Sequence, residues 1–346
     1  MAPSAPRSIK KFMGRCLLSI CDAFPAAKPI LRKWGVRTSK DWFGRRVVRV
    51  QMPDGNSFKL ASLGRNYLSF ELFWRGTGYY EPITTLLMRE LVQPGDTFID
   101  VGANIGFYSL VLSASRPRIR VIAFEPNPRN FAMLADNADV NGFASITCEA
   151  LAMSDTEGLA TLYLSASDMS ASLRCDFDSH PADTAEVRTA TLDDYLARDT
   201  IQGRLTVKVD VEGHEESFFR GAGHTLASLQ PDIITEVALN YSAESVAMLR
   251  QAGYRFYPIT DQGFHEADAL VPVVRGRLVF LNYLLSSRPP KEVAGFFERI
   301  APKVKQIDLA QTSKCLDWKS VQNFIGRSSA SQPAPETNAV PAGNLR

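Results

Sequence analysis

A glycine-rich turn between two apolar runs restricts this chain more than any other segment. The apolar residues 97–99 lead into Asp100-Val101-Gly102-Ala103-Asn104-Ile105-Gly106, and a second apolar run follows at 110–112. This order predicts a strand, a tight turn and a helix, because Gly102 and Gly106 lack a Cβ and let the backbone approach a ligand closely. Such a unit is typical of open α/β sheets, whose ligands bind at the carboxyl ends of the strands.

A second acidic residue ends the next apolar run. Glu125 follows the apolar residues 121–124 and is itself followed by Pro126-Asn127. A carboxylate at the tip of the second strand is placed to accept hydrogen bonds from both hydroxyls of a ribose. Asp100 and Glu125 together therefore predict a site for a cofactor that contains a nucleoside.

The spacing of the glycines favours one kind of nucleoside cofactor. Three residues separate Gly102 from Gly106, whereas dinucleotide-binding turns follow G-x-G-x-x-G and place a middle glycine beside the pyrophosphate. A phosphate-binding loop ends in lysine, and here Phe107 follows Gly106. An acidic turn suits a cationic ligand better. S-adenosyl-L-methionine carries an ammonium, a sulfonium and a ribose, so it is favoured over a nicotinamide dinucleotide.

Five segments in order resemble the FkbM family of S-adenosylmethionine-dependent methyltransferases. They are FIDVGANIGFYS, AFEPNPRNFAMLADNADVNG, LAMSDTEG, TLDDYL and VKVDVEGHEESFFRGA, and the resemblance runs from about Glu81 to about Glu236. It implies a Rossmann-like class I methyltransferase fold with a mostly parallel, doubly wound sheet, and O-methylation of a hydroxyl on a sugar, a glycan or a secondary metabolite. The expected cofactor contacts are Glu81, Asp100, Gly102, Ala103, Asn104, Gly106, Tyr108, Glu125, Pro126, Asn127, Ser154 and Asp155. The segment Ala152-Met153-Ser154-Asp155 lies where the adenine is expected, and the alternative is that Ser154 and Asp155 only make a turn.

Charged residues interrupt a later apolar strand in a regular pattern. In an extended strand over 205–211 the valines share one face, and Lys208, Asp210 and Glu212 share the other. Charges in a buried strand are costly unless they are paired or functional, and these precede Gly213 at the strand's carboxyl end. The predicted catalytic residues are Lys208, Asp210, Glu212 and His214.

Methyl transfer to a hydroxyl needs an aligned acceptor oxygen and a base that removes its proton. Asp210 is predicted to face the methionine part of the cofactor, and Glu212 or His214 to face the acceptor. His214 suits the base because its ordinary pKa is near neutrality, and a plain helix start is the alternative. A divalent metal would use Asp210, Glu212 and Glu236, but the spacing does not require one and we expect none. The acceptor pocket is expected from Asp168 to Arg188 and the C-terminal strands.

Alternating apolar patterns predict one large α/β domain with extensions. We expect a basic N-terminal helical extension at 1–45, a hairpin subdomain at 46–80 and a methyltransferase domain at 81–290, followed by a C-terminal helical segment at 291–326 and a disordered tail at 327–346. Strands are expected near 97–101, 121–125, 145–149, 205–211, 232–238, 254–259 and 277–285. A helix is expected to begin at Pro82 and to end at Pro94-Gly95-Asp96, and further helices are expected near 105–115, 128–140, 215–229 and 243–252. Gly158 to Arg188 is the least regular segment.

The first fifty residues carry twelve basic side chains against two acidic ones. Within 9–24, Phe12, Cys16, Ile20 and Phe24 recur at helical spacing, and Lys10 lies largely off that stripe. Such a helix either lies on an anionic membrane surface or packs on the domain with a solvated basic face.

Composition narrows the remaining possibilities. A net charge of +2 does not point to a nucleic-acid partner. The five cysteines form no cluster and the chain has no long apolar run, which favours a reducing, cytoplasmic location. The protein would be peripheral at a membrane if its N-terminal helix binds there. We expect no nucleic-acid partner. Two alternatives stay open beside the methyltransferase: a cofactor-binding but inactive interaction protein, and a nicotinamide-dependent oxidoreductase.

Overall fold

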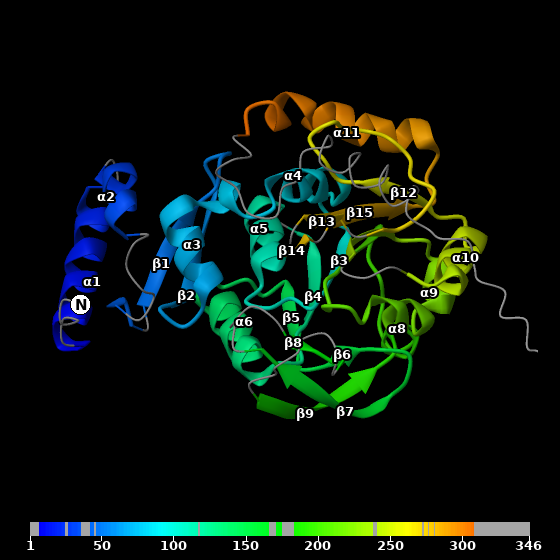
Figure 1. Cartoon of the computed structure of the whole chain (residues 1–346), viewed down its shortest axis with the longest axis horizontal. Helices are drawn as coiled ribbons and strands as arrows, with labels where there is room; N and C mark the ends of the chain where they lie inside the picture. The colour runs from blue at the N-terminus through cyan, green and yellow to red at the C-terminus, as the bar shows by residue number, and fades with distance from the viewer. Residues whose placement is uncertain are drawn as a thin grey trace, which may run out of the picture.

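The fold was analysed in a computed structural model (Figure 1). It describes residues 7–24, 27–35, 42–44, 46–116, 118–165, 171–174, 183–237, 241–271, 273–275, 277–279 and 281–307. The expected tail at 327–346 and most of the expected helical segment at 291–326 lie outside these residues. The described part of that segment belongs to helix α11 (Pro290–Val304).

A seven-stranded sheet forms the centre of the molecule. Its strands lie in the order β12-β15-β11-β10-β3-β4-β5, and β15 alone runs against its neighbours. This topology confirms the predicted α/β fold with a mostly parallel sheet. The bounds are β3 (Thr97–Val101), β4 (Arg120–Phe124), β5 (Ile146–Glu149), β10 (Leu205–Val209), β11 (Asp232–Val237), β12 (Arg255–Pro258) and β15 (Leu281–Ser286).

Three expectations about the strands and helices need correction. Strand β10 ends at Val209, because the chain then leaves the extended conformation and forms a turn with positive φ angles at Glu212 and Gly213. The region 277–285 holds two strands, since β14 (Arg277–Val279) pairs with β13 (Val273–Arg275) outside the main sheet. The helix expected at 215–229 is two helices, α8 (Glu215–Arg220) and α9 (Gly223–Ser228). The chain breaks at Gly221, where a Cβ would overlap the backbone of Ser154.

Each face of the sheet has its own apolar core, because successive strand residues point to opposite faces. Phe98 belongs to the core beneath α4 (Pro82–Leu91), α5 (Phe107–Ser115) and α11. The next residue, Ile99, belongs to the core beneath α7 (Leu192–Leu196), α8, α9 and α10 (Ala243–Gln251). Helix α6 (Pro128–Asn141) packs beside β5. The sheet is therefore covered on both faces, as a doubly wound fold requires.

The predicted hairpin is present and is attached to the main domain. Strands β1 (Arg46–Gln51) and β2 (Ser57–Leu63) pair antiparallel, and α3 (Tyr67–Arg75) and a short 3₁₀ helix (Thr77–Tyr79) follow. On helix α6, Asn137 Oδ1 accepts the Ala61 N–H at 2.7 Å, and Asn141 Oδ1 accepts the Lys59 N–H at 2.7 Å. These amides satisfy the exposed edge of β2, which explains why the hairpin packs against α6.

The segment expected to be least regular contains a second sheet. Strands β6 (Ala152–Met153), β7 (Gly158–Leu164), β8 (Ala171–Ser172) and β9 (Asp183–Ala190) lie in the order β6-β9-β7-β8. Sequence alternation was weak here because this sheet buries a small core around Leu162 and Val187. Residues 166–170 and 175–182 lie outside the described chain.

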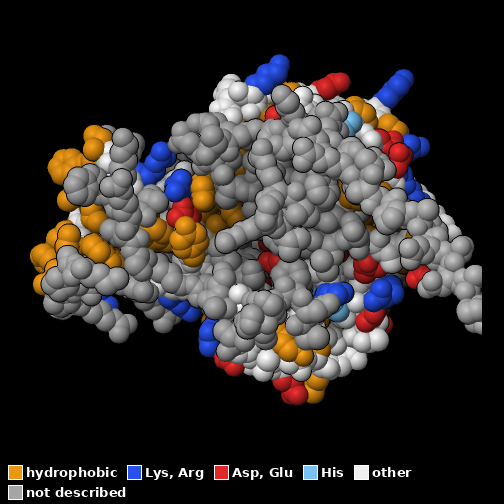
Figure 2. All heavy atoms as spheres, viewed as in Figure 1, with side chains coloured by type: hydrophobic (Ala, Val, Ile, Leu, Met, Phe, Trp, Pro, Cys, Tyr) orange, Lys and Arg blue, Asp and Glu red, His pale blue; other side chains and the backbone are white. Residues whose placement is uncertain are grey.

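Helix α1 (Arg7–Ala23) packs on the domain through a face that differs from the predicted stripe. Leu18 and Cys21 are buried, whereas Phe12 is 67% and Ile20 is 42% exposed. The buried face follows the close approach of Gly14 to the backbone of Trp42. Figure 2 shows apolar side chains gathered over the α1 and α2 (Lys28–Gly35) end of the molecule. Among the described residues, none of the helices is long and apolar enough to cross a membrane.

Candidate functional site

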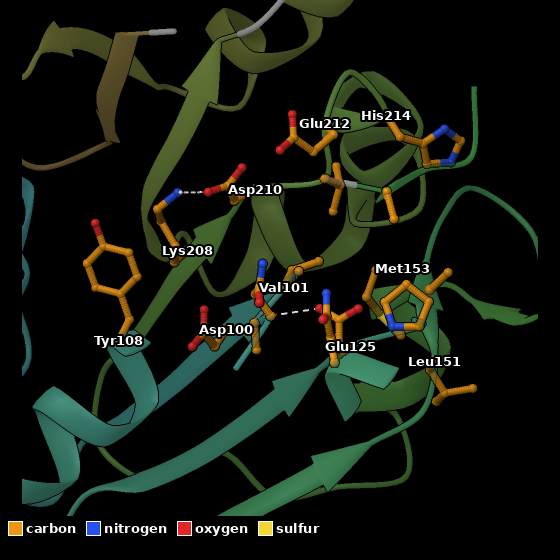
Figure 3. A pocket seen from close by; sticks show the side chains of 18 of the residues that line it. Asp100, Val101, Tyr108, Glu125, Leu151, Met153, Lys208, Asp210, Glu212 and His214 are labelled. Carbon is orange, nitrogen blue, oxygen red and sulfur yellow. Dashed lines mark hydrogen bonds and ion pairs between the residues drawn. The ribbon is translucent and has the colours of Figure 1, made fainter. Parts of the chain in front are cut away.

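The site lies where the chain order of the sheet reverses. From β3 the chain continues outward through β4 and β5, and it returns at β10 on the other side of β3. Ligands of open α/β sheets bind at such a switch point, beyond the carboxyl ends of the strands. A cavity of about 310 Å³ lies there, lined from the β3–α5 turn, the end of β4, the β10–α8 turn and the small second sheet (Figure 3).

Glu125 fixes the turn after β3 to the end of β4. Its Oε2 accepts the Asn104 N–H at 2.7 Å, and its Oε1 accepts the Asn127 N–H at 2.8 Å. Burial raises the pKa of this carboxyl to about 7, although both backbone donors oppose the shift. Each oxygen keeps a second lone pair, so the carboxylate can accept two further hydrogen bonds from a ligand in the cavity.

Asp100 ends β3 within the same cavity wall. Its Oδ2 accepts from Ser109 Oγ at 2.6 Å and from the Ser109 N–H at 3.2 Å, which ties it to helix α5. Burial raises the pKa of Asp100 to about 6, while Ser109 and Lys208 counteract the increase. Lys208 is its register partner on β10, so both side chains point to the same face.

The glycines of the turn are required by packing inside the protein. Gly102 has a φ of +77° and a Cβ there would overlap the Asp210 carbonyl oxygen, while a Cβ on Gly106 would come within 2.6 Å of Leu134. Gly102 nevertheless lines the cavity, whereas Gly106 does not. Gly106 therefore does not make room for a ligand, although the sequence had suggested it, and only Gly102 is placed to do so.

A buried polar network joins the end of β10 to helix α4. Lys208 Nζ lies 3.2 Å from Asp210 Oδ2, and the ammonium is 5.6 Å from the centre of the Tyr108 ring. The Tyr108 hydroxyl donates to Glu81 Oε2 at 2.5 Å, and Asn282 Nδ2 donates to the same oxygen at 2.8 Å. Glu81 therefore lies behind the cavity wall, because its carboxylate is held by Tyr108 and Asn282 and it does not line the cavity.

His214 and Glu212 lie farther along the turn that follows β10. His214 Nε2 lies 2.9 Å from Ser154 Oγ, and burial lowers the pKa of the imidazole below its ordinary value. The lowered pKa favours the neutral imidazole, which is the form that a general base needs. Glu212 takes a left-handed backbone conformation with a φ of 52°, and its carbonyl accepts from Ser172 Oγ at 2.8 Å.

The structure brings most of the predicted residues to one cavity. The predicted catalytic residues Lys208, Asp210, Glu212 and His214 all line it, and so do Asp100, Gly102, Ala103, Asn104, Tyr108, Glu125 and Pro126. Five predicted cofactor contacts do not line it, namely Glu81, Gly106, Asn127, Ser154 and Asp155. Asp155 instead pairs with Arg220 at 3.0 Å, and Ser154 Oγ lies 2.9 Å from Nε2 of His214, which does line the cavity.

Several apolar lining residues were not named as contacts from the sequence, although Met153 lies in the segment expected beside the adenine. Leu151 and Met153 extend the wall beside Glu125, Leu68 comes from α3, and Leu162 and Leu173 come from the second sheet. Ala171 also lines the cavity, so the segment 168–188 contributes as expected, while the described residues of the C-terminal strands do not. The sequence around Ala152 indicated the β6 region, but single apolar residues on α3 carry no local signal of a site.

Comparison with known families gives a match that covers most of the residues lining the cavity. Residues 100–256 match the model of the methyltransferase FkbM domain, a little under half of the chain. The chain is 27% identical over 215 residues to the hexuronic acid methyltransferase AglP of Haloferax volcanii, which covers 61% of this chain and 84% of that protein. It is 28% identical over 163 residues to methyltransferase 1 of Beauveria bassiana, covering 42% of this chain and 66% of that protein.

Two solved structures resemble part of the chain. The methyltransferase FkbM of Methylobacillus flagellatus has 17% identity and a TM-score of 0.37, covering 56% of this chain and 44% of that one. The precorrin-6y C5,15-methyltransferase of Geobacter metallireducens has 14% identity and a TM-score of 0.36, covering 60% of this chain and 88% of that one.

Proposed function

We propose that this chain, an S-adenosylmethionine-dependent methyltransferase that carries an FkbM domain, transfers the methyl group to a hydroxyl of a sugar, a glycan or a secondary metabolite. The observation that carries the proposal is the buried Glu125 carboxylate at the end of β4, beside the glycine turn of β3, in a cavity at the switch point of the sheet. We assign the catalytic unit to residues 81–290.

The cavity suits the parts of S-adenosylmethionine in a definite order. The ribose hydroxyls donate to the free lone pairs of Glu125, and the adenine packs against the apolar side chains of Leu151 and Met153. Figure 3 shows these two side chains on the same side of the cavity as Glu125. The methionine part then extends toward Asp100 and Asp210, whose carboxylates attract its ammonium.

The acceptor approaches from the side of the second sheet. Glu212 and His214 lie on the turn after β10, next to the cavity wall formed by Ala171 and Leu173. In our assignment His214 removes the proton from the acceptor hydroxyl, because burial keeps its imidazole neutral. Alignment of the acceptor oxygen with the methyl group supplies a further part of the rate.

Calorimetric titration with S-adenosylhomocysteine tests the proposal, with NADH as the comparison. We expect saturable binding of one S-adenosylhomocysteine per chain and no binding of NADH. An absence of S-adenosylhomocysteine binding would favour an inactive interaction protein, and binding of NADH alone would favour an oxidoreductase. After positive binding, hydroxylated sugars and metabolites are screened as acceptors with labelled S-adenosylmethionine.

We further propose that the outer face of α1 contacts an anionic lipid surface. Phe12 and Phe24 are each 67% exposed, and Ile30 on α2 is 73% exposed. Lys10, Lys11 and Arg15 belong to the same helix, within a region where basic residues outnumber acidic ones. Exposed apolar side chains beside basic ones favour the interface of an anionic membrane.

Vesicle co-sedimentation tests this surface. The full chain is expected to sediment with phosphatidylglycerol vesicles and to stay in solution with phosphatidylcholine vesicles. The Phe12→Ser/Ile20→Ser variant should lose binding, whereas Leu159→Ser should keep it, because Leu159 is equally exposed but lies on β7. Equal sedimentation of all three proteins would exclude α1 as the contact.

A further inference from the structure

Three acidic side chains meet behind the wall of the cavity. One carboxylate oxygen from each of Glu81, Asp210 and Glu236 lies within 4.8 Å of the other two. Two oxygens that bind the same cation at about 2.0–2.6 Å lie at most about 4–5 Å apart. The separations are therefore those of ligands around a single divalent cation.

The strand register explains why these groups converge. Val209 on β10 pairs with Thr235 on β11, so the next residues, Asp210 and Glu236, stand side by side. Glu236 pairs in turn with Asn282 on β15. Directly paired residues share a face of the sheet, and helix α4, which begins after Glu81, covers that face.

The amide of Asn282 is the independent sign of a missing ligand. Its side chain is 5% exposed, and Nδ2 donates to Glu81 Oε2 at 2.8 Å, which places the carboxamide at the cluster. Its Oδ1 is buried and finds no hydrogen-bond donor in the described part of the chain. Amide oxygens are ordinary ligands of Mg²⁺ and Ca²⁺.

The charges of the region also favour a cation. Glu81 and Glu236 are 1% and 2% exposed, so two of the three carboxylates lie in the interior, where a divalent cation would offset their charge. Lys208 contributes one positive charge, 3.2 Å from Asp210, against three carboxylates of the cluster. Asp210 alone of the three lines the cavity, and its side chain is 20% exposed, which leaves a path for the ion.

We propose that Glu81, Asp210, Glu236 and the amide oxygen of Asn282 bind one divalent cation of the Mg²⁺, Mn²⁺ or Ca²⁺ class. Asp210 lines the cavity, so an ion held by its carboxylate would lie next to the space that a ligand enters. If the proposed function holds, the ion lowers the pKa of the acceptor hydroxyl and shares the task given to His214. Glu212, named as a ligand from the sequence, is replaced by Glu81.

The site is tested by titrating the chelator-treated full chain with Mn²⁺. The electron paramagnetic resonance signal of free Mn²⁺ measures how much of the ion stays unbound. We expect one saturable site per chain. Glu236→Gln should weaken binding by roughly tenfold or more, because ligand charge sets affinity. The matched control is Glu157→Gln, which changes an exposed carboxylate between β6 and β7, and this variant should bind Mn²⁺ like the wild type.

Two substitutions of Asn282 separate ligation from folding. Asn282→Leu should weaken Mn²⁺ binding, whereas Asn282→Asp should strengthen it by adding a charge at the same place. A wild-type chain that binds no Mn²⁺, or variants that all bind it equally, would overturn the site and leave Lys208 as the counter-ion of the cluster. S-adenosylhomocysteine titration of the same samples keeps the two proposals distinct, because loss of that binding with Mn²⁺ retained contradicts the cofactor assignment alone.

Discussion

Gly102 packs directly against the backbone of Asp210. A Cβ at residue 102 would overlap the Asp210 carbonyl oxygen, and the Asp210 N–H donates to the Val101 carbonyl at 3.0 Å. The first glycine of the β3–α5 turn therefore touches the residue that follows β10. The two motifs that stand out in the sequence are joined by backbone contact at the switch point.

Gly102→Ala should destabilise the protein by about 3 kcal/mol, since it adds both a left-handed conformation for a side chain and an overlap with Asp210. Gly142→Ala is the matched control, because Gly142 also has a positive φ, +66°, but nothing lies within 4 Å of its Cβ position. The control should lose about 1 kcal/mol. Urea unfolding measures both values, and equal losses would show that the contact with Asp210 is unimportant.

The affinity for S-adenosylhomocysteine should increase with pH between 6 and 8. Burial raises the pKa of Glu125 to about 7, so the ligand-free site is mostly protonated at pH 6, and the ionised form accepts the ribose hydroxyls better. If only that form binds, the affinity increases about tenfold over this range. Glu125→Gln should bind weakly and without this pH dependence. Calorimetry at several pH values decides, and an unchanged slope in the variant would assign the effect elsewhere.

Asp210→Asn should reduce kcat by roughly 10²-fold or more, because it removes a carboxylate that we assign to holding the methionine part of the cofactor in the orientation needed for transfer. The fold should survive, since the shape of the side chain is kept. Asp268→Asn, at an exposed position far from the cavity, is the control. Turnover is measured with the identified acceptor, and wild-type turnover in Asp210→Asn would exclude a catalytic role.

His214→Gln should lower kcat by roughly 10²–10⁴-fold if His214 is the general base. Burial lowers its pKa, so the activity of the wild type should fall only as the pH drops below the ordinary value of 6.5. Ser154→Ala removes the partner at 2.9 Å and should change the rate far less. If the activity of His214→Gln still falls at acidic pH as that of the wild type does, His214 is not the titrating base, and Glu212 becomes the candidate.

Deletion of residues 1–25 should leave the affinity for S-adenosylhomocysteine within about threefold of the wild type, because α1 contributes nothing to the cavity. The deletion removes Leu18 and Cys21 from the core, and burying one such side chain stabilises by about 1.5–3 kcal/mol. The thermal midpoint should therefore fall. Loss of binding at a temperature where the truncated chain is still folded would make α1 part of the catalytic unit.

The sequence determined most of the helices and strands and the acidic residues that line the cavity. Strand periodicity and the glycine turn located β3, β4 and β10, and parallel strands bring their carboxyl ends together, so Asp100, Glu125 and Asp210 were bound to converge. Local pattern also located the hairpin and the helix that begins at Pro82. These predictions depend only on residues that are close together in the chain, and the periodicity of apolar residues is a property of such short segments.

Only the tertiary structure decided which distant residues meet. Glu81 and Asn282, 201 residues apart, share a hydrogen bond because β15 inserts between β12 and β11 and because α4 covers that face. The same is true of α1, where the sequence marked an apolar stripe but packing buried Leu18 and Cys21 instead. A periodic pattern specifies that a face is apolar. Strand order, register and close backbone contacts decide what covers that face, and none of these has a local signature.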